Sequence, residues 1–361
     1  MSHPLDVADL RARVQAAVDA EIRTQAGVLD EIGEDLSPIV QAVADLLRGG
    51  KRLRAGFLYW GYRAGGRPDS DALLRAATAM EFFQAAALLH DDVMDGSDTR
   101  RGMPAAHRAL AATHLARGWS GDARRFGEAG AILAGDLCLT WTDELYATSG
   151  LPADALARGR VWFDRMRTQL MGGQFLDVLE SARGWADCTT EERVARARRV
   201  IRYKSAKYSV EHPLLIGVAA AGVDPADLAA LSSYGLDLGE AFQLRDDLLG
   251  VFGDPAETGK PAGDDLREGK RTVLLAHALD VASAAESAVI ERLLGRPDLD
   301  AAGVEQLRAV IHATGAIEAV EKLITDLAAT ARDALHATNT LDSQAFSVLD
   351  QLVDTATDRS S

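Results

Sequence analysis

The chain has 361 residues, of which 47% are apolar and 26% are charged. This apolar share is enough for a sizeable hydrophobic core, so the composition excludes a chain that is disordered throughout. The 39 lysines and arginines stand against 54 aspartates and glutamates, and the resulting net charge of -15 argues against nucleic acid or an anionic membrane surface as the main partner. Any phosphate-binding site must therefore be a local basic pocket.

Two features bear on the cellular location. Residues 1–13 carry acids early and lack the apolar core of a signal peptide, and the longest apolar run, 214–223, is too short to cross a bilayer. We therefore expect a cytoplasmic protein without an integral membrane segment. The two cysteines, Cys138 and Cys188, match neither a zinc-binding spacing nor a disulfide framework, so we interpret them as ordinary thiols.

Helical periodicity extends over almost the whole chain, and no segment has a convincing strand-like alternation, so the pattern predicts an all-α fold. Since there is neither a low-complexity linker nor a fixed-period repeat, we expect a single domain over residues 1–361, with about four frayed residues at each end. In chain order, the predicted helical segments span residues 5–32, 37–47, 51–63, 72–95, 109–116, 127–148, 152–183, 190–210, 214–221, 225–252 and, as several helices, 272–357, with connections at 96–108, 118–125 and 253–269.

Cap and breaker residues set these boundaries. Ser37 and Ser70 are the expected N-caps of the second and central helices, and Asp224, followed by proline, begins the helix that ends at residue 252. Pro213 is expected to end or kink the helix that contains it. The polar segment 253–269 is rich in Gly, Pro and Asp and is predicted to be a functional loop or lid.

The central predicted helix ends in acid. Its apolar stretch leads into Asp91, Asp92 and Asp95, and Gly96 stands where a left-handed residue closes a helix. A helix C-terminus already carries partial negative charge, so three aspartates there are disfavoured unless a cation joins them. Asp91 and Asp95 are four residues apart, hence on one face and within reach of the same cation or pair of cations. The arginines at 100 and 101 offer forked donors suited to phosphate oxygens.

A second long predicted helix also ends in acid, at Asp246 and Asp247. A single acid-rich turn is typical of a solvated face, but two carboxylate clusters at helix ends can oppose each other and hold hard divalent cations. Magnesium commonly joins one or two carboxylates to substrate phosphates, whereas calcium storage needs a denser cage from one contiguous loop. The pair of clusters therefore predicts magnesium held between protein carboxylates and a phosphate-bearing ligand.

Other polar residues allow two interpretations. Lys51 and Arg54 are three residues apart beside the N-terminus of a predicted helix, which suits an anion but is also typical of a solvated basic turn. Gln174 and Asp177 are three residues apart on one predicted helix. They either face a common polar site or are surface residues.

Together these motifs resemble the trans-type, head-to-tail isoprenyl diphosphate synthases of the polyprenyl synthetase family. The resemblance covers nearly the whole chain, from Gly49 to at least Thr272, in unchanged order. It rests on Gly-Lys-Arg-Leu-Arg at 50–54, the aspartates of 91–95 with Arg-Arg-Gly at 100–102, Gly-Gly-Gln at 172–174 with Asp177, Lys-Ser at 204–205, Phe-Gln at 242–243 with Asp-Asp at 246–247, Gly-Lys at 259–260, and Gly-Asp-Asp-Leu at 263–266 before Lys270. It implies an isoprenoid-synthase-type helical bundle around a central apolar cavity.

The resemblance also implies roles for individual residues. Three magnesium ions are expected, two at the first aspartate motif, Asp91 and Asp95 with Asp92 in support, and one at Asp246 with Asp247. For the allylic diphosphate the implied residues are Arg100, Lys204 and Lys260; for isopentenyl diphosphate they are Lys51, Arg54, Gln84 and Arg101; Ser205, Gln243 and Asp177 join Lys204 at the reacting centre, and Lys270 helps to close the site. Members of the family are usually dimeric, so a homodimer is expected.

Three positions depart from the family pattern. Gln84 stands where many members have histidine, Ala55 replaces an expected proline, and Gly250 replaces the last aspartate of the second motif. We expect the lost carboxylate to weaken the third metal site without removing it, because two aspartates of the motif remain and Asp254 lies one turn further on.

The helix before Asp91 bears on product length. Ala87 and Ala86 stand four and five residues before it, and Phe83 and Phe82 follow about one turn further back. Short-chain members of the family often have an aromatic floor at the first of these levels. One helical turn, about 5.4 Å, is comparable with one extended isoprene unit, so we expect a product of about twenty carbons, geranylgeranyl diphosphate. The alternatives are a farnesyl or a longer product, with both phenylalanines as ordinary core residues and the floor on another helix.

Three rival functions remain at this stage. A terpene cyclase of the same fold ionises one diphosphate and does not need the second phosphate site that Lys51, Arg54 and Arg101 would serve. A catalytically silent subunit that tunes an active synthase should have lost aspartates of the first motif, which this chain retains; only Gly250 favours it. A plain metal-binding or scaffold protein would not need the basic residues.

Overall fold

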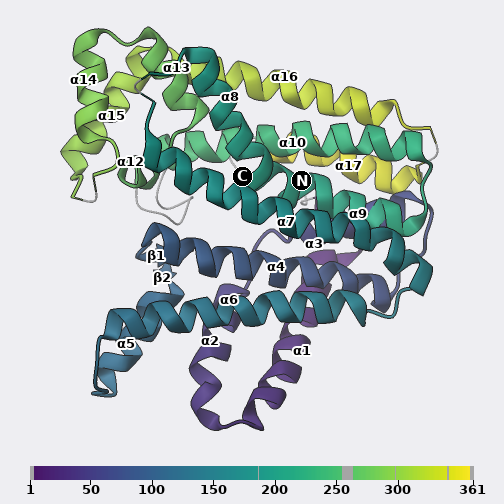
Figure 1. Cartoon of the computed structure of the whole chain (residues 1–361). Coiled ribbons are helices and arrows are strands. Elements are labelled where there is room, and N and C mark those ends of the chain that lie inside the picture. The colour runs from purple at the N-terminus through teal and green to yellow at the C-terminus, as the bar shows by residue number, and fades with distance from the viewer. Residues whose placement is uncertain (1–3, 186, 254–262, 297, 340, 358–361) are drawn as a thin grey trace.

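The computed structural model describes residues 4–185, 187–253, 263–296, 298–339 and 341–357. Nearly all regular structure in this part of the chain is helical (Figure 1). The predicted all-α class is therefore confirmed, with one short hairpin added.

The first elements are η1 (Pro4–Asp9), α1 (Leu10–Asp30), η2 (Glu34–Leu36), α2 (Ser37–Leu46), α3 (Leu53–Ala64), α4 (Asp71–Asp95), β1 (Thr99–Arg100), β2 (Met103–Pro104), α5 (Ala106–Ala116), α6 (Ala123–Ala147) and α7 (Ala153–Arg183). They are followed by α8 (Thr190–Val200), the π-helical segment η3 (Ile201–Glu211), α9 (His212–Ala221), α10 (Pro225–Phe252), α12 (Asp264–Glu268), α13 (Val273–Val281), α14 (Ala284–Leu293), α15 (Ala301–Ala313), α16 (Ala316–His336) and α17 (Ser343–Thr357).

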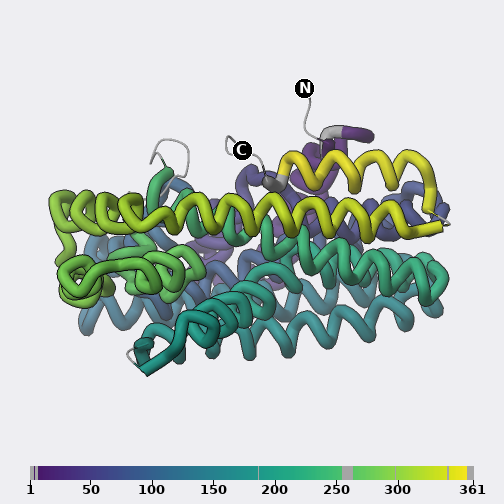
Figure 2. The backbone as a smooth tube through the Cα atoms, turned by 90° about the horizontal axis from the view of Figure 1, so that it is seen from above, coloured from purple at the N-terminus to yellow at the C-terminus, as the bar shows by residue number. Residues whose placement is uncertain are grey.

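The long helices lie side by side across the molecule (Figures 1 and 2). α4 packs against α6 and α3, α7 packs against η3 and α9, and α10 packs against η3 and α16. Figure 1 shows α1 and α2 projecting on the side of α6, while α14 and α15 form one end. The two helices predicted to end in acid, α4 and α10, both belong to this central set.

The buried apolar side chains form two clusters. One joins α1, α3, α4, α6, α7 and α9 with α17, and the other joins α8 and the C-terminal half of α10 with the helices from α12 to α16. α10 belongs to both, since Leu231 and Leu238 lie in the first cluster while Leu244 and Leu248 lie in the second. The half of α10 that carries the acidic motif therefore begins where the two clusters meet.

The caps of the two acidic helices agree with the prediction. Ser70 Oγ accepts a hydrogen bond from the backbone N–H of Leu73 at 3.1 Å, and Asp224 accepts one from that of Ala226 at 2.8 Å. Gly96 closes α4 with a φ of 67°, and α10 ends at the predicted residue 252. Both aspartate motifs thus stand at helix ends, as their chemistry requires.

Three other predicted boundaries are wrong. The helix expected from residue 5 begins at Leu10, after the 3-10 segment η1. Ser37 is the first residue of α2 and Leu36 is its N-cap, because η2 leads directly into the helix. Pro213 does not end the helical run, since η3 passes directly into α9 at His212, where the hydrogen bonding changes from i→i+5 to i→i+4; the alternative, a kink at Pro213, stays a prediction.

A hairpin that the periodicity did not predict follows α4. Thr99 pairs with Pro104 and Arg100 with Met103 in antiparallel register. The turn residues Arg101 and Gly102 have φ values of 53° and 74°, the left-handed conformation that tight two-residue hairpin turns favour. Two residues per strand are too few to produce an alternating sequence pattern.

α4 has the length and composition of a membrane-crossing helix, although Glu81 interrupts its apolar sequence, so that it contains no uninterrupted apolar run of that length. It is nevertheless the central helix of the fold, and 72% of that stretch is buried inside the protein. Its apolar character is explained by the core that surrounds it.

Candidate active site

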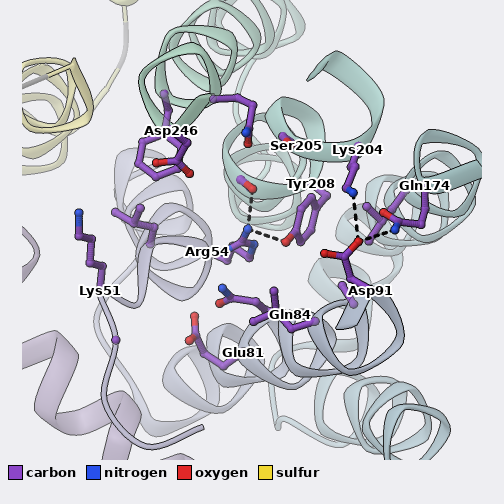
Figure 3. A pocket seen from close by; sticks show the side chains of 18 of the residues that line it. Lys51, Arg54, Glu81, Gln84, Asp91, Gln174, Lys204, Ser205, Tyr208 and Asp246 are labelled. Carbon is purple, nitrogen blue, oxygen red and sulfur yellow. Dashed lines mark hydrogen bonds and ion pairs between the residues drawn. The ribbon is translucent and has the colours of Figure 1, made fainter. Parts of the chain in front are cut away.

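One pocket joins the two acidic helix ends (Figure 3). Asp91 of α4 and Asp246 of α10 both line it. The other predicted site residues that line it are Lys51, Arg54, Gln84, Ala87, Arg100, Arg101, Lys204, Ser205, Gln243 and Lys270, and Gln174 lines it with them. The magnesium hypothesis required a shared opening between the two acidic helix ends, and the fold provides one.

Donors from two other elements hold Asp91. Its Oδ1 accepts hydrogen bonds from Gln174 Nε2 of α7 at 2.5 Å and from Lys204 Nζ of η3 at 3.0 Å. The same ammonium group lies 2.5 Å from Asp177 Oδ2. Gln174 and Asp177 therefore face a common polar site, which decides between the two interpretations that the sequence left open.

The aspartates at the end of α4 differ in how readily they ionise. Burial opposes ionisation of Asp91, but the charges of Lys204, Lys270 and Arg100 lower its pKa to about 2. Burial and the Asp91 carboxylate raise the pKa of Asp95 to about 7. A divalent cation between these two side chains would offset their repulsion, and carboxylate oxygens are ligands that magnesium prefers. The donor set therefore fits magnesium.

Asp92 has a different environment. It is 2% exposed and pairs with Arg100, whose Nε lies 2.9 Å from Asp92 Oδ1. The hairpin after α4 delivers Arg100 to this position, where its guanidinium group lines the pocket 3.6 Å from Asp91. This place suits support of Arg100 better than direct metal binding.

The π-helical segment η3 supplies Lys204 through a close approach to α7. A Cβ atom on Gly173 would lie 2.3 Å from the carbonyl carbon of Tyr203, so only glycine permits this packing. It brings Lys204 within reach of Asp177 on α7. Helices with i→i+5 hydrogen bonds are rare and frequent at functional sites. The second glycine of the Gly-Gly-Gln motif thus has a direct structural reason.

At the acidic end of α10, burial and the repulsion between carboxylates oppose the ionisation of Asp247. Asp246 lines the pocket, whereas Asp247 is 7% exposed and accepts a hydrogen bond from Gln243 Nε2 at 2.8 Å. Burial and the charge of Asp265 raise the pKa of Asp247 to about 7. Lys270 Nζ lies 3.3 Å from Asp265 Oδ1, and although burial opposes its charge, the surrounding carboxylates, with Asp265 the largest contributor, hold its pKa well above the ordinary value.

The pocket also has a basic wall, formed by Lys51, Arg54 and Arg101. Lys51 stands before α3, and Gln84, which lines the same pocket, lies on α4 two turns before Asp91 (Figure 3). Arg101 Nη1 donates to the carbonyl of Leu46 at 3.0 Å, and burial lowers the pKa of its guanidinium. Converging cations in a partly buried pocket favour the anion-binding interpretation over a solvated basic turn.

Two residues that hold Arg54 were not predicted. Arg54 Nη2 donates to Tyr208 Oη at 2.6 Å and to Ser209 Oγ at 2.7 Å, and its guanidinium carbon lies 4.2 Å from the centre of the Tyr208 ring. Tyr208 and Ser209 follow Lys204 and Ser205 by four positions. Residues four apart lie on the same face of a helix, so this spacing could have predicted that Tyr208 and Ser209 also face the pocket.

A buried ion pair under the basic wall was also missed. Arg52 and Glu81 have side chains that are each 2% exposed, and their charged atoms lie 2.8 Å apart. Glu81 Oε1 accepts a hydrogen bond from the backbone N–H of Ala55 at 3.2 Å. The expected proline at this position has no N–H to donate, so the departure at Ala55 adds a bond that helps to hold the start of α3 against α4.

The level below Ala87 is filled by aromatic rings. Ala86 is buried, and the Phe83 ring meets the Tyr208 ring edge-on with centroids 6.2 Å apart. The Phe82 ring meets Trp141 of α6 edge-on at 6.1 Å. Both phenylalanines are at most 1% exposed. The predicted floor on α4 stays a prediction, and α6 adds a further aromatic residue at this level.

Some predicted residues do not border the pocket. The residues that line it do not include Asp92, Asp95, Asp177 or Asp247, while Lys260 and Asp254 fall outside the described residues. Within the described part of the chain, no three His, Cys, Asp or Glu side chains are arranged to hold a metal ion on their own. Magnesium that takes part of its ligands from substrate phosphate does not require such a preformed cage.

The fold and the pocket together define a class of protein. An all-α bundle with two acidic helix ends and a basic wall around one pocket is suited to binding and ionising isoprenyl diphosphates. Residues 37–311 match the family model described as polyprenyl synthetase. The chain belongs to the polyprenyl synthetase family and is a trans-prenyltransferase.

Solved structures and curated relatives agree with this placement. The crystal structure of a geranylgeranyl pyrophosphate synthase from Corynebacterium glutamicum, complexed with isoprenyl diphosphate and magnesium, has a TM-score of 0.93 and 39% identity, covering 98% of this chain and 100% of that chain. A geranylfarnesyl diphosphate synthase of Natronomonas pharaonis is 30% identical over 334 residues, 92% of this chain and 88% of that protein. A geranylgeranyl diphosphate synthase of Sulfolobus acidocaldarius is 31% identical over 265 residues, 73% and 68% of the two chains. The names differ in product length.

Proposed function

We propose that the protein condenses isopentenyl diphosphate head-to-tail with an allylic diphosphate, with magnesium as cofactor, and that its main product is geranylgeranyl diphosphate. The observation that carries the proposal is the single pocket in which Asp91 and Asp246 face the basic wall of Lys51 and Arg54. A second diphosphate site next to a metal-binding site is needed for condensation but not for cyclisation. We further propose a cytoplasmic homodimer with one domain per chain.

The acidic side of the pocket handles the allylic diphosphate. Asp91 with Asp95, and Asp246 with Asp247, would hold three magnesium ions, two at the end of α4 and one at the end of α10. Magnesium, when bound, neutralises the diphosphate as its allylic C–O bond breaks. Arg100 and Lys204, with Lys260, add fixed positive charge around the departing diphosphate, and such preorganised charge is often the largest contribution to catalysis.

The basic side holds the second substrate. Lys51, Arg54, Gln84 and Arg101 would bind the diphosphate of isopentenyl diphosphate, so that its double bond is already positioned against the allylic carbon. Arg54 is oriented by Tyr208, which reduces the freedom that binding must remove. The Gln84 amide donates to phosphate in place of the histidine common in the family.

The last step is loss of a proton from the new carbocation. No histidine lines the pocket among the described residues, and the departed diphosphate is the nearest base in the proposed arrangement. Ser205 and Gln243 line the reacting centre between the two sides, and Lys270 helps to close it. Apolar side chains over the rest of the cavity keep out water that would quench the cation.

Product length follows from the α4 face below Asp91. Ala87 leaves room for one further isoprene unit, since one helical turn rises about 5.4 Å, and Phe83 with Phe82 blocks the next level. Both phenylalanines are packed against other aromatic rings, so neither moves aside freely. This supports a product of about twenty carbons, longer than farnesyl and shorter than the polyprenyl products.

The test is incubation of the purified protein with magnesium, labelled isopentenyl diphosphate and each of dimethylallyl, geranyl and farnesyl diphosphate, followed by sizing of the products. We expect geranylgeranyl diphosphate from all three. Absence of condensation with every allylic substrate would contradict the proposal and favour a silent regulatory subunit. Phe83→Ala should lengthen the product, whereas Phe126→Ala, at a position 40% exposed on α6, should leave it unchanged. An unchanged product from Phe83→Ala would locate the floor on another helix.

A further inference from the structure

Tyr208 is the aromatic side chain that borders the pocket at the level of the predicted floor. Phe82 and Phe83 are each at most 1% exposed, and the residues that line the pocket include neither of them. The Tyr208 ring does line the pocket, and it meets the Phe83 ring edge-on with centroids 6.2 Å apart. At this level the cavity is therefore bordered by a ring of η3, and Phe83 of α4 packs against that ring.

η3 and α4 pass each other in a fixed register. Lys204 Nζ of η3 lies 3.0 Å from Asp91 Oδ1 of α4, whereas Tyr208, further along η3, meets Phe83, which precedes Asp91 on α4. Movement from Asp91 toward Phe83 along α4 thus corresponds to movement from Lys204 toward Tyr208 along η3. A prenyl chain that extends from a diphosphate at Asp91 past Ala87 would meet the Tyr208 ring at the next level.

The Tyr208 ring is held in place from two sides. Its hydroxyl accepts a hydrogen bond from Arg54 Nη2 at 2.6 Å, and the guanidinium carbon of Arg54 lies 4.2 Å from the ring centre. The edge-on contact with Phe83 restrains the ring from α4. Figure 3 shows Tyr208 between Arg54 and Asp91, so the ring stands between the two substrate sides of the pocket.

We propose that Tyr208 determines product length: its ring closes the prenyl cavity from η3, and Phe83 of α4 supports that ring. The inference rests on the proposed function, since it needs condensation in this pocket, and it names the residue at which chain growth ends. A chain of more than about twenty carbons would have to displace the ring and break its hydrogen bond with Arg54, which also serves the second substrate. The ring limits the first substrate and the hydroxyl orients a residue for the second.

The rival explanation is that Tyr208 only orients Arg54. In that case loss of the ring weakens the binding of isopentenyl diphosphate without opening the cavity. Weaker binding of the second substrate leaves products as short as before or shorter, because each elongation step consumes one isopentenyl diphosphate. The two explanations therefore predict different changes in product length.

The experiment compares the full chain with Tyr208→Phe, which keeps the ring and removes the hydroxyl, and with Tyr208→Leu and Tyr208→Val, which remove the ring. Each protein is incubated with magnesium, farnesyl diphosphate and labelled isopentenyl diphosphate, and the products are sized. Circular dichroism with thermal melting checks that each variant folds. Phe346→Leu is the matched control, because it removes a half-buried ring that packs against His336 and does not line the pocket.

A second measurement does not depend on catalysis. Allylic thiolodiphosphates, whose C–S bond resists ionisation, are titrated into each protein with magnesium, and their affinities are measured by isothermal titration calorimetry. One analogue has about twenty carbons and the other has about one isoprene unit more. The parent chain should bind the longer analogue about tenfold more weakly, because the extra unit does not fit, whereas the two variants without the ring should bind both analogues within about threefold of each other.

We expect Tyr208→Phe to keep the product of about twenty carbons and to raise KM for isopentenyl diphosphate by about fivefold, the effect of one lost hydrogen bond. Tyr208→Leu and Tyr208→Val should lengthen the main product by about one isoprene unit or more. Phe346→Leu should match the parent chain in both measurements.

Two results would overturn the inference. One is that the folded leucine and valine variants bind the longer analogue no better than the parent chain does, and the other is that Tyr208→Phe lengthens the product as much as Tyr208→Leu. If removal of the ring abolishes condensation, the affinities of the analogues decide between the two explanations. Failure of the proposed function looks different, because the parent chain itself would then make no product from any allylic diphosphate.

Discussion

The two acidic helix ends of this protein carry similar residues but are balanced differently. At the end of α4, Asp91 accepts hydrogen bonds from Lys204 and Gln174, and its pKa is lowered to about 2. At the end of α10, Asp247 is buried beside Asp265, and its pKa is raised to about 7. Asp91 is therefore stabilised by cations of the protein itself, whereas Asp247, like Asp95 at the end of α4, is buried beside another carboxylate whose repulsion an added cation would relieve.

This difference has a functional meaning. A carboxylate that fixed cations already hold in its ionised form, as Asp91 is held, is preorganised for a diphosphate that arrives with its magnesium, while a buried carboxyl beside another acid, as Asp247 is, gains more when the last cation binds. We infer that the end of α4 fixes the allylic diphosphate first and that the end of α10 completes the site. Three substitutions test the comparison, from the largest expected effect to the smallest.

The largest effect is expected from Asp91→Asn, which keeps the shape of the side chain and removes its charge. Because Asp91 is the pocket-lining acid at the end of α4, kcat/KM for condensation should fall about 10³-fold, as for other groups that stabilise charge in a transition state. Steady-state kinetics with labelled isopentenyl diphosphate measures this. The control is Asp136→Asn, on a side chain that is 59% exposed. A loss of less than about tenfold would mean that the end of α4 does not dominate.

Lys204→Ala should have the next largest effect. Its ammonium group bridges Asp91 and Asp177, so its removal exposes both carboxylates to each other at the allylic side of the pocket. We expect kcat/KM to fall about 10²-fold, with KM raised for the allylic substrate and not for isopentenyl diphosphate. Lys322→Ala, at a side chain 76% exposed on α16, is the control. Equal rises in both KM values would show that Lys204 serves both substrates.

The smallest effect is on stability. The pKa of Asp247 is raised from 3.8 to about 7 in the folded protein. The folded protein therefore loses stability as the pH rises from about 4 to about 7, because over this interval the carboxyl ionises in the unfolded chain but not in the folded one. Asp247→Asn should therefore raise the melting temperature of the metal-free protein at pH 7.5, by about 2 °C, and by less at pH 5. Gln243 can still donate to the new amide oxygen.

Asp91→Asn should instead lower the melting temperature of the metal-free protein at pH 7.5, since the ionised form of Asp91 is stabilised in the folded protein. Scanning calorimetry or dye-based melting without divalent metal checks both variants. A fall in melting temperature for both would mean that the two helix ends are balanced alike.

Much of the fold could be predicted because its signals are local. Ser70 and Gly96 delimit α4, and Asp224 begins α10, since capping depends on a few neighbouring residues. The hairpin that carries Arg100 could not be predicted, because two residues per strand produce no periodicity. The π-helical register of η3 was also missed, and it depends on packing against α7 at Gly173.

The site divides in the same way. The types and spacing of Asp91, Asp95 and Asp246 were enough to propose magnesium with a phosphate-bearing ligand, and the resemblance to the family added Lys204. Asp91, Asp246 and Lys204 all line the pocket. Glu81 and Tyr208 were missed because their roles are to hold other side chains, and such roles have no motif of their own. Lys260 lies outside the described residues.

The order of charged and apolar residues by itself determined the helical class and the acidic helix ends, since helix periodicity, capping and the preference of magnesium for carboxylates all act through residue type and short spacing. The family followed from the resemblance of the motifs. Only the tertiary structure decided that Tyr208 meets Phe83 and that Arg52 is buried against Glu81. Both contacts join segments that are distant along the chain, and their distances depend on how whole helices pack.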